Sequence, residues 1–223
     1  MYIQQIFFYI MLGIECVLLI PFLMNFSKLE KSGRIIFYYL ISAIVFAAGS
    51  QIIASIWKNN LWFWNSMYFI QFVIFSIYFH EIIKSKPIRL VTVILMLPIL
   101  GFTILDYLVL EGPHAYNSYA VAVDTLILMV YSVLFFWQLL RDEGLVKQSI
   151  FINSLPDFWY NAGIFIFHCG FFLFSLSYNI RLFKGTTLLQ RTPDTILAIT
   201  FIAGIIQLIL LYIGLLKAKR IRP

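Results

Sequence analysis

Two ionisable side chains, Glu15 and His168, each fall about halfway along a long apolar stretch. A charge in the middle of a bilayer costs about 3 kcal/mol on insertion scales, so such residues face the interior of a helix bundle and are paired or neutral. A carboxyl and an imidazole can also act together in proton transfer. One hypothesis is therefore that Glu15 and His168 pair beside a cavity that binds a proton or a ligand. The alternative is a protonated Glu15 bonded to a hydroxyl or a backbone carbonyl, with His168 satisfied elsewhere.

The stretch around His168 carries two stripes of residues at helical spacing. One stripe is polar, because Asn161, His168 and Ser175 recur every seven residues and therefore share a helix face. We expect this face to be a cavity wall. The other stripe consists of small residues on roughly the opposite side: Gly163, Gly170 and Ser177. Small residues let helix backbones approach closely, so the second stripe predicts a helix-packing face.

Three further polar residues lie inside apolar stretches, namely Asp106, Asp124 and Gln207. The charge pattern described below places Asp106 and Asp124 in the outer half of the membrane. Gln207 shares a helix face with Thr200 and Gly204, which lie seven and three residues before it. Asp106 and Asp124, together with Gln51 and Asn65 in the same outer half, predict a polar vestibule that opens to the outside. The alternative for Asp106 is a position close enough to the membrane surface to be hydrated.

The cysteines and histidines give no metal site. Cys16 and Cys169 are single, and His80, His114 and His168 lie at three different depths. A structural zinc site needs four such ligands together. The sequence contains no phosphate loop, dinucleotide fingerprint or Gly-x-Ser-x-Gly elbow. We therefore expect no metal, no cofactor and no catalytic residue.

The composition of the chain predicts that membrane-spanning helices position the polar side chains described above. Of 223 residues, 62% are hydrophobic and only 12% are charged, whereas a soluble domain is about half apolar and a quarter charged. This balance excludes a soluble enzyme, a disordered chain and a disulfide-stapled secreted module. A membrane-spanning helix needs about 20 apolar residues, and seven stretches qualify. They predict an all-α protein with a single seven-helix transmembrane domain over 1–223, and with spans near 2–25, 35–57, 61–80, 90–110, 119–140, 158–180 and 194–216.

The positive charges predict the orientation of these spans. Twelve of the 16 Lys and Arg residues fall in the links after the first, third and fifth spans and in the C-terminal tail. Lys and Arg are enriched in cytoplasmic links, so we expect the N-terminus outside and the C-terminus inside. The basic balance is then a signal of topology. The excess of positive charge does not indicate a nucleic-acid partner. The partner expected of this chain is the lipid bilayer.

The sixth stretch also carries a recognisable pattern. Residues 155–170 read LPDFWYNAGIFIFHCG, followed by FFLF at 171–174. The opening Pro-x-Phe-Trp, the spaced glycines and the aromatic run resemble the sixth span of uncharacterised bacterial seven-helix membrane proteins that accompany sensor histidine kinases. The resemblance is limited to this span, and His168 departs from its pattern, so no family role passes to that residue. The resemblance implies a sensory or regulatory protein of the bacterial inner membrane that has no enzymatic activity of its own.

Three functions are compatible with these residues. The first is a membrane-embedded sensor or accessory signalling protein that partners a histidine kinase or another membrane protein. The second is a small-solute or proton-coupled transporter in which Glu15 titrates. The third is an intramembrane enzyme, which would need Glu15 and His168 as an acid–base pair.

Overall fold

A computed structural model describes residues 2–57, 59–113, 115–142, 144, 151–178 and 192–221 of the chain. Every regular element within these residues is helical, in agreement with the all-α prediction. The elements are α1 (Tyr2–Met24), η1 (Phe26–Lys28), α2 (Lys31–Trp57), α3 (Leu61–Ile82), α4 (Lys86–Ile94), α5 (Met96–Leu105), η2 (Asp106–Leu110), α6 (Ser118–Leu140), η3 (Ile152–Ser154), α8 (Pro156–Tyr178) and α10 (Thr192–Ile221).

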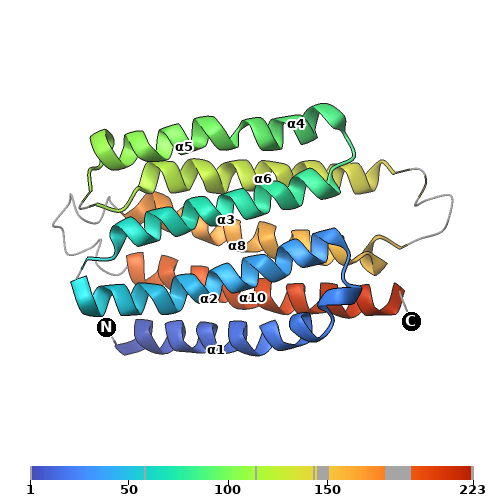
Figure 1. Cartoon of the computed structure of the whole chain (residues 1–223), viewed down its shortest axis with the longest axis horizontal. Coiled ribbons are helices and arrows are strands. Elements are labelled where there is room, and N and C mark those ends of the chain that lie inside the picture. The colour runs from blue at the N-terminus through green and yellow to red at the C-terminus, as the bar shows by residue number, and fades with distance from the viewer. Residues whose placement is uncertain are drawn as a thin grey trace.

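The long helices lie side by side and run alternately in opposite directions (Figure 1). We call the end of the bundle where α1 begins the N-end, and the end where α10 finishes the C-end; they are on the left and on the right of Figure 1. α4, α5 and η2 follow one another and together make one passage from the C-end to the N-end. The link from α8 to α10, residues 179–191, lies outside the described residues, as does the end of the predicted sixth span.

Six segments of the described chain are long and apolar enough to cross a membrane, as expected of a multi-pass membrane protein. They are Lys31–Trp57, Leu61–Ile82, Lys86–Leu110, Ser118–Leu140, Pro156–Ser177 and Ile196–Lys219. The first predicted span corresponds to a shorter apolar helix over Phe8–Met24. Several helices extend past the predicted spans into polar residues, because a helix does not end where its apolar run ends.

The passage made by α4 and α5 is interrupted at Leu95. The cause is three residues further along the chain, where Pro98 has no N–H to donate to the carbonyl of Ile94. Hydrogen bonds on both sides keep the two helices joined, since Leu95 N–H donates to Val91 O over 3.0 Å and Ile99 N–H donates to Leu95 O over 3.1 Å. This passage is also the least buried of the six, and it lies at the edge of the bundle in Figure 1.

α8 lies between α6 and α10 and packs extensively on both. Gly163 and Gly170 are directed at α10: a Cβ atom built on Gly163 would be 3.1 Å from the Gln207 carbonyl oxygen, and one built on Gly170 would be 3.0 Å from the Ala203 Cβ. The Thr200 hydroxyl adds a hydrogen bond across this interface, 3.2 Å from the Gly170 carbonyl oxygen. Ser177 is partly buried, and its hydroxyl donates to the Phe174 carbonyl of its own helix.

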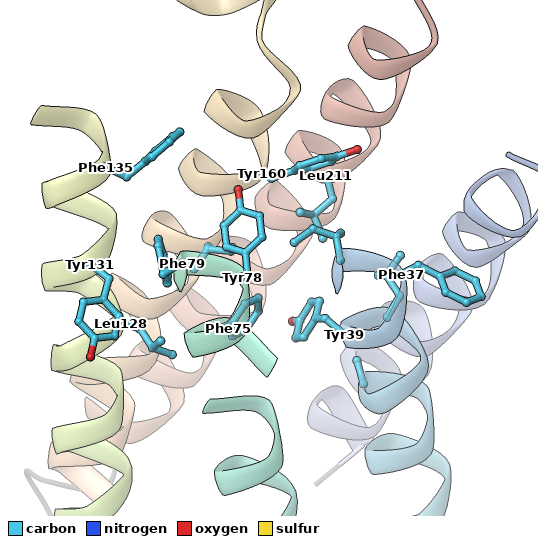
Figure 2. Close-up of a cluster of buried hydrophobic side chains, with 14 of the residues drawn as sticks. Phe37, Tyr39, Phe75, Tyr78, Phe79, Leu128, Tyr131, Phe135, Tyr160 and Leu211 are labelled. Carbon is cyan, nitrogen blue, oxygen red and sulfur yellow. The ribbon is translucent and has the colours of Figure 1, made fainter. Parts of the chain in front are cut away.

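The C-end half of the bundle is filled by aromatic and aliphatic side chains. Phe22, Tyr78, Phe79, Leu211 and Leu215 are fully buried there. Figure 2 shows how rings from different helices meet in this core, including Tyr39 of α2 and Phe75 of α3, whose centroids are 4.4 Å apart. Tyr39 also lines the site described next, and Phe75 packs behind it.

Candidate functional site

A cavity of about 190 Å³ lies among α1, α2, α3, α8 and α10, in the N-end half of the bundle. We call it the aromatic cavity, because nine of its lining residues carry aromatic rings. These residues are Phe8, Tyr39, Phe46, Trp64, Tyr68, Phe167, Phe171, Phe174 and Phe201. Eight of these described lining residues carry a polar group: Glu15, Tyr39, Ser50, Trp64, Tyr68, Gln71, Thr200 and Gln207. A mostly apolar concavity with a few polar groups is the usual form of a small-molecule site.

Each helix contributes to the cavity through one face. On α1 the lining residues Phe8, Met11, Leu12 and Glu15 follow an i, i+3, i+4, i+7 spacing, which places them on one side of the helix. The lining residues of α2 repeat the same spacing from Ala43 onward, at positions 43, 46, 47 and 50, and Tyr39 lies one turn before them on the same face. Thus the five faces are set by helical periodicity, and packing of the bundle brings them around one space.

The inner floor of the aromatic cavity holds three polar side chains at mid-bundle depth. The Tyr39 hydroxyl donates a hydrogen bond of 3.1 Å to Gln207 Oε1, and the buried Nε2 of Gln207 has no acceptor within the described residues. Glu15 is 7% exposed and acts electrostatically on the Tyr39 phenol. Among the residues that the structure describes, no hydrogen bond or ion pair to the Glu15 carboxyl is found. Glu15 and Gln207 are the two predicted site residues that the fold brings to one cavity.

The opposite, N-end side of the cavity is organised by Ser50. Its hydroxyl oxygen accepts hydrogen bonds from Trp64 Nε1 over 2.6 Å and from Asn60 Nδ2 over 2.7 Å. These bonds fix the turn between α2 and α3 and hold the Trp64 indole in the cavity wall. Tyr39, Ser50 and Trp64 were not predicted as site residues from the sequence. The aromatic residues that recur at helical spacing could have indicated an aromatic face.

His168 lies away from Glu15 and does not line the cavity. Its Nδ1 donates a 2.7 Å hydrogen bond to the Ile164 carbonyl one turn earlier in α8. The imidazole packs edge-on against Phe75 and Phe167, with centroid distances of 5.4 and 5.3 Å. Within the described residues no hydrogen bond or ion pair joins it to Glu15. His168 is thus satisfied separately, as the alternative interpretation had it, whereas the bond from Glu15 to a hydroxyl or a backbone carbonyl in that interpretation is not found among these residues. The arrangement gives no support to an enzyme that uses Glu15 and His168 as a pair.

Asp106 caps a helix and is not among the residues that line the aromatic cavity. It is fully buried, and its Oδ2 accepts the backbone N–H of Ala120 over 2.9 Å. The neighbouring carboxylate of Glu111 accepts the backbone N–H and the hydroxyl of Ser118. The first N–H groups of a helix have no partner inside the helix and favour negative charge. Asp106 and Glu111 therefore satisfy N–H groups at the start of α6, while the buried Oδ1 of Asp106 has no partner within the described residues.

Asp124 and Asn161 are also buried outside the cavity lining. Asn161 Nδ2 donates to the Ser132 carbonyl over 3.2 Å and so joins α8 to α6. Several polar atoms on α3, α6 and α8 have no partner within the described part of the chain: Ser76 Oγ, Asp124 Oδ1, Tyr131 OH, Ser132 Oγ and Asn161 Oδ1. The polar face predicted for the sixth span thus lies against neighbouring helices, and neither Asn161 nor Asp124 lines the aromatic cavity.

We expect Asp106→Ala to lower the free energy of unfolding by about 1–2 kcal/mol, because it removes the acceptor at the start of α6. Asp106→Asn keeps a side-chain oxygen and should cost less than the alanine variant. Thermal unfolding of the purified protein in lipid nanodiscs measures both. Equal losses in the two variants would contradict the capping role.

No metal-binding group is found in the described residues, where no three His, Cys, Asp or Glu side chains are placed to hold an ion together. Cys16 and Cys169 are free, and His114 lies outside the described residues. Comparison of the chain with protein-family models, with curated proteins and with solved structures finds no match. The candidate site therefore stands on its own geometry.

Proposed function

We propose that this chain is a seven-span protein of the bacterial inner membrane that senses a small ligand in the aromatic cavity and passes the signal to a membrane partner. The observation that carries the proposal is the cavity itself, with Glu15, Tyr39 and Gln207 on its floor. The partner proposed is a sensor histidine kinase, on the resemblance of the sixth span.

The proposed orientation places the N-end outside and the C-end in the cytoplasm. Basic residues gather in the C-end turns and in the last turns of α10, including Lys28, Lys31, Arg34, Lys84 and Lys86. Positive charge favours the cytoplasmic side of a membrane. With this orientation the aromatic cavity lies in the outer half of the membrane, where an external ligand would reach it.

A route for the signal runs along helices that contribute to both ends of the bundle. α2, α3 and α8 line the aromatic cavity, and they also line a charged groove at the C-end that includes Lys31, Glu81 and Asp157. The turn between α3 and α4 is tied to α6, because Gln138 donates to the Ile82 carbonyl over 3.1 Å and accepts the Lys84 N–H over 2.6 Å. A ligand that shifts α2 or α3 would therefore change the C-end surface offered to a partner.

We expect the full-length protein, purified gently from its native membrane, to carry a histidine kinase with it. Reconstituted with that kinase in nanodiscs, the wild-type chain should change the autophosphorylation rate relative to kinase alone. A variant that fills the cavity, Ala43→Phe, should still bind the kinase but lose this effect. Repeated purification without any kinase would contradict the proposed partnership.

A second candidate is a small-solute or proton-coupled transporter, and the observation that favours it is the carboxyl of Glu15 on a cavity floor at mid-bundle depth. Transport would also require a passage from Glu15 to the C-end, where Phe22, Leu211 and Leu215 are fully buried in the core. Solute uptake into liposomes that disappears in Glu15→Gln would favour transport over sensing.

A further inference from the structure

Among the described residues that line the aromatic cavity, Glu15 is the one that carries a charge. The part of the lining that the structure describes contains no Lys, Arg or His, and the same residues supply no ion pair to the carboxyl. A carboxylate taken out of water needs a positive or hydrogen-bonding partner to offset its lost hydration. The described residues provide no such partner for the Glu15 carboxylate, and a bound ligand in the cavity could supply it.

The walls of the cavity are suited to a positive charge. Nine aromatic residues surround the space, including Trp64 and Tyr68 on α3 and the stacked pair Phe167 and Phe171 on α8, whose rings lie 5.5 Å apart. Aromatic faces attract cations, most strongly when water is excluded, and several rings around one space are a known way to hold an alkylated ammonium group. The aromatic walls and the carboxyl on the floor thus favour the same kind of ligand.

Gln207 indicates that the ligand should also carry a hydrogen-bond acceptor. It is 2% exposed, and one end of its amide bonds the Tyr39 hydroxyl while the buried Nε2 on the other end has no acceptor within the described part of the chain. A buried donor without a partner costs about 1–3 kcal/mol. A ligand oxygen on the cavity floor would satisfy it. The volume of about 190 Å³ limits the ligand to a compact molecule.

We propose that the aromatic cavity binds a small organic ammonium ion that carries a hydroxyl or similar oxygen, with Glu15 as its counter-ion and Gln207 as the donor to its oxygen. This inference rests on the proposed function only in requiring that the cavity admit a small molecule. The ammonium group could come from a free amine in solution or from an amine lipid headgroup, and the experiment separates these sources.

The test measures thermal unfolding of the full chain in nanodiscs of phosphatidylglycerol, which has no amine. Choline is compared with its uncharged analogue 3,3-dimethylbutan-1-ol, and ethanolamine with 1-propanol, so that each pair keeps the hydroxyl and differs in the ammonium group. A ligand that binds the folded state raises the melting temperature with its concentration. We expect each cation to bind at least about tenfold more tightly than its neutral partner. The same titrations in phosphatidylethanolamine nanodiscs should give smaller shifts if a lipid headgroup occupies the cavity, and equal shifts if the ligand is a free amine.

Two variants complete the test. Glu15→Gln should reduce choline affinity at least about tenfold and leave the neutral analogue unchanged, whereas Glu81→Gln, which changes an exposed carboxyl paired with Lys31 at the C-end, should bind choline like the wild type. Neutral analogues that bind as tightly as the cations would overturn the ammonium assignment while showing that the cavity accepts small molecules. Absence of binding by all four probes would overturn it too, whereas the sensor proposal is decided separately by kinase association.

Discussion

Gly163→Leu should prevent α8 and α10 from reaching their native separation and should lower the free energy of unfolding by about 3 kcal/mol or more. Even a Cβ at this position would lie 3.1 Å from the Gln207 carbonyl oxygen and 3.3 Å from the Leu210 Cβ. The nearest obstacle is the backbone of α10, which cannot move aside as a flexible side chain can. Because Gln207 belongs to the cavity floor, the same variant should also lose ligand binding. Thermal unfolding and choline titration in nanodiscs measure the two effects.

Gly13→Leu is the matched control for that substitution. Gly13 also lies within a helix, but a Cβ built on it meets no atom within 4 Å. The leucine should be neutral, or stabilising by up to about 1 kcal/mol, because glycine is a poor helix former. If the two variants lost the same stability, close packing of α8 on α10 would not explain the result at Gly163.

Glu15→Met should make the ligand-free protein more stable, by about 1–3 kcal/mol, while abolishing its response to choline. Methionine has a similar shape and needs no hydrogen-bonding partner, whereas the buried carboxyl of Glu15 finds none among the described residues. A binding site that is less stable than it could be is common where a residue is kept for its ligand. Unfolding in nanodiscs without ligand gives the stability, and the choline titration gives the loss of binding.

Glu81→Met provides the comparison for Glu15→Met. Glu81 is exposed on the C-end surface, 3.9 Å from Lys31, so its replacement should change stability by no more than about 0.5 kcal/mol. A loss of stability in Glu15→Met would mean that the carboxyl has a stabilising partner in the unliganded protein. That result would contradict the proposal that the Glu15 carboxyl lacks a partner until a cationic ligand binds.

The helices could be predicted from the sequence because each depends on its own residues. Long apolar runs select helices in a membrane, since every backbone N–H and carbonyl must be satisfied within the segment. The predicted 61–80 and 119–140 agree closely with Leu61–Ile82 and Ser118–Leu140. The spacing of Gly163 and Gly170 likewise indicated a close helix contact, and both residues lie against α10. Seven spans and their orientation remain predictions, because the described residues give six long apolar helices and one shorter one.

The sequence by itself therefore determined the helices, their apolar character and the scarcity of charge that makes Glu15 and Gln207 notable. Only the tertiary structure decided which polar residues share a site. Helical spacing places a side chain on a face of its own helix, but the rotation of that helix against its neighbours depends on packing between residues far apart in sequence. That rotation puts Glu15 and Gln207 on one cavity floor, His168 between phenylalanines, and Asp106 at the start of α6.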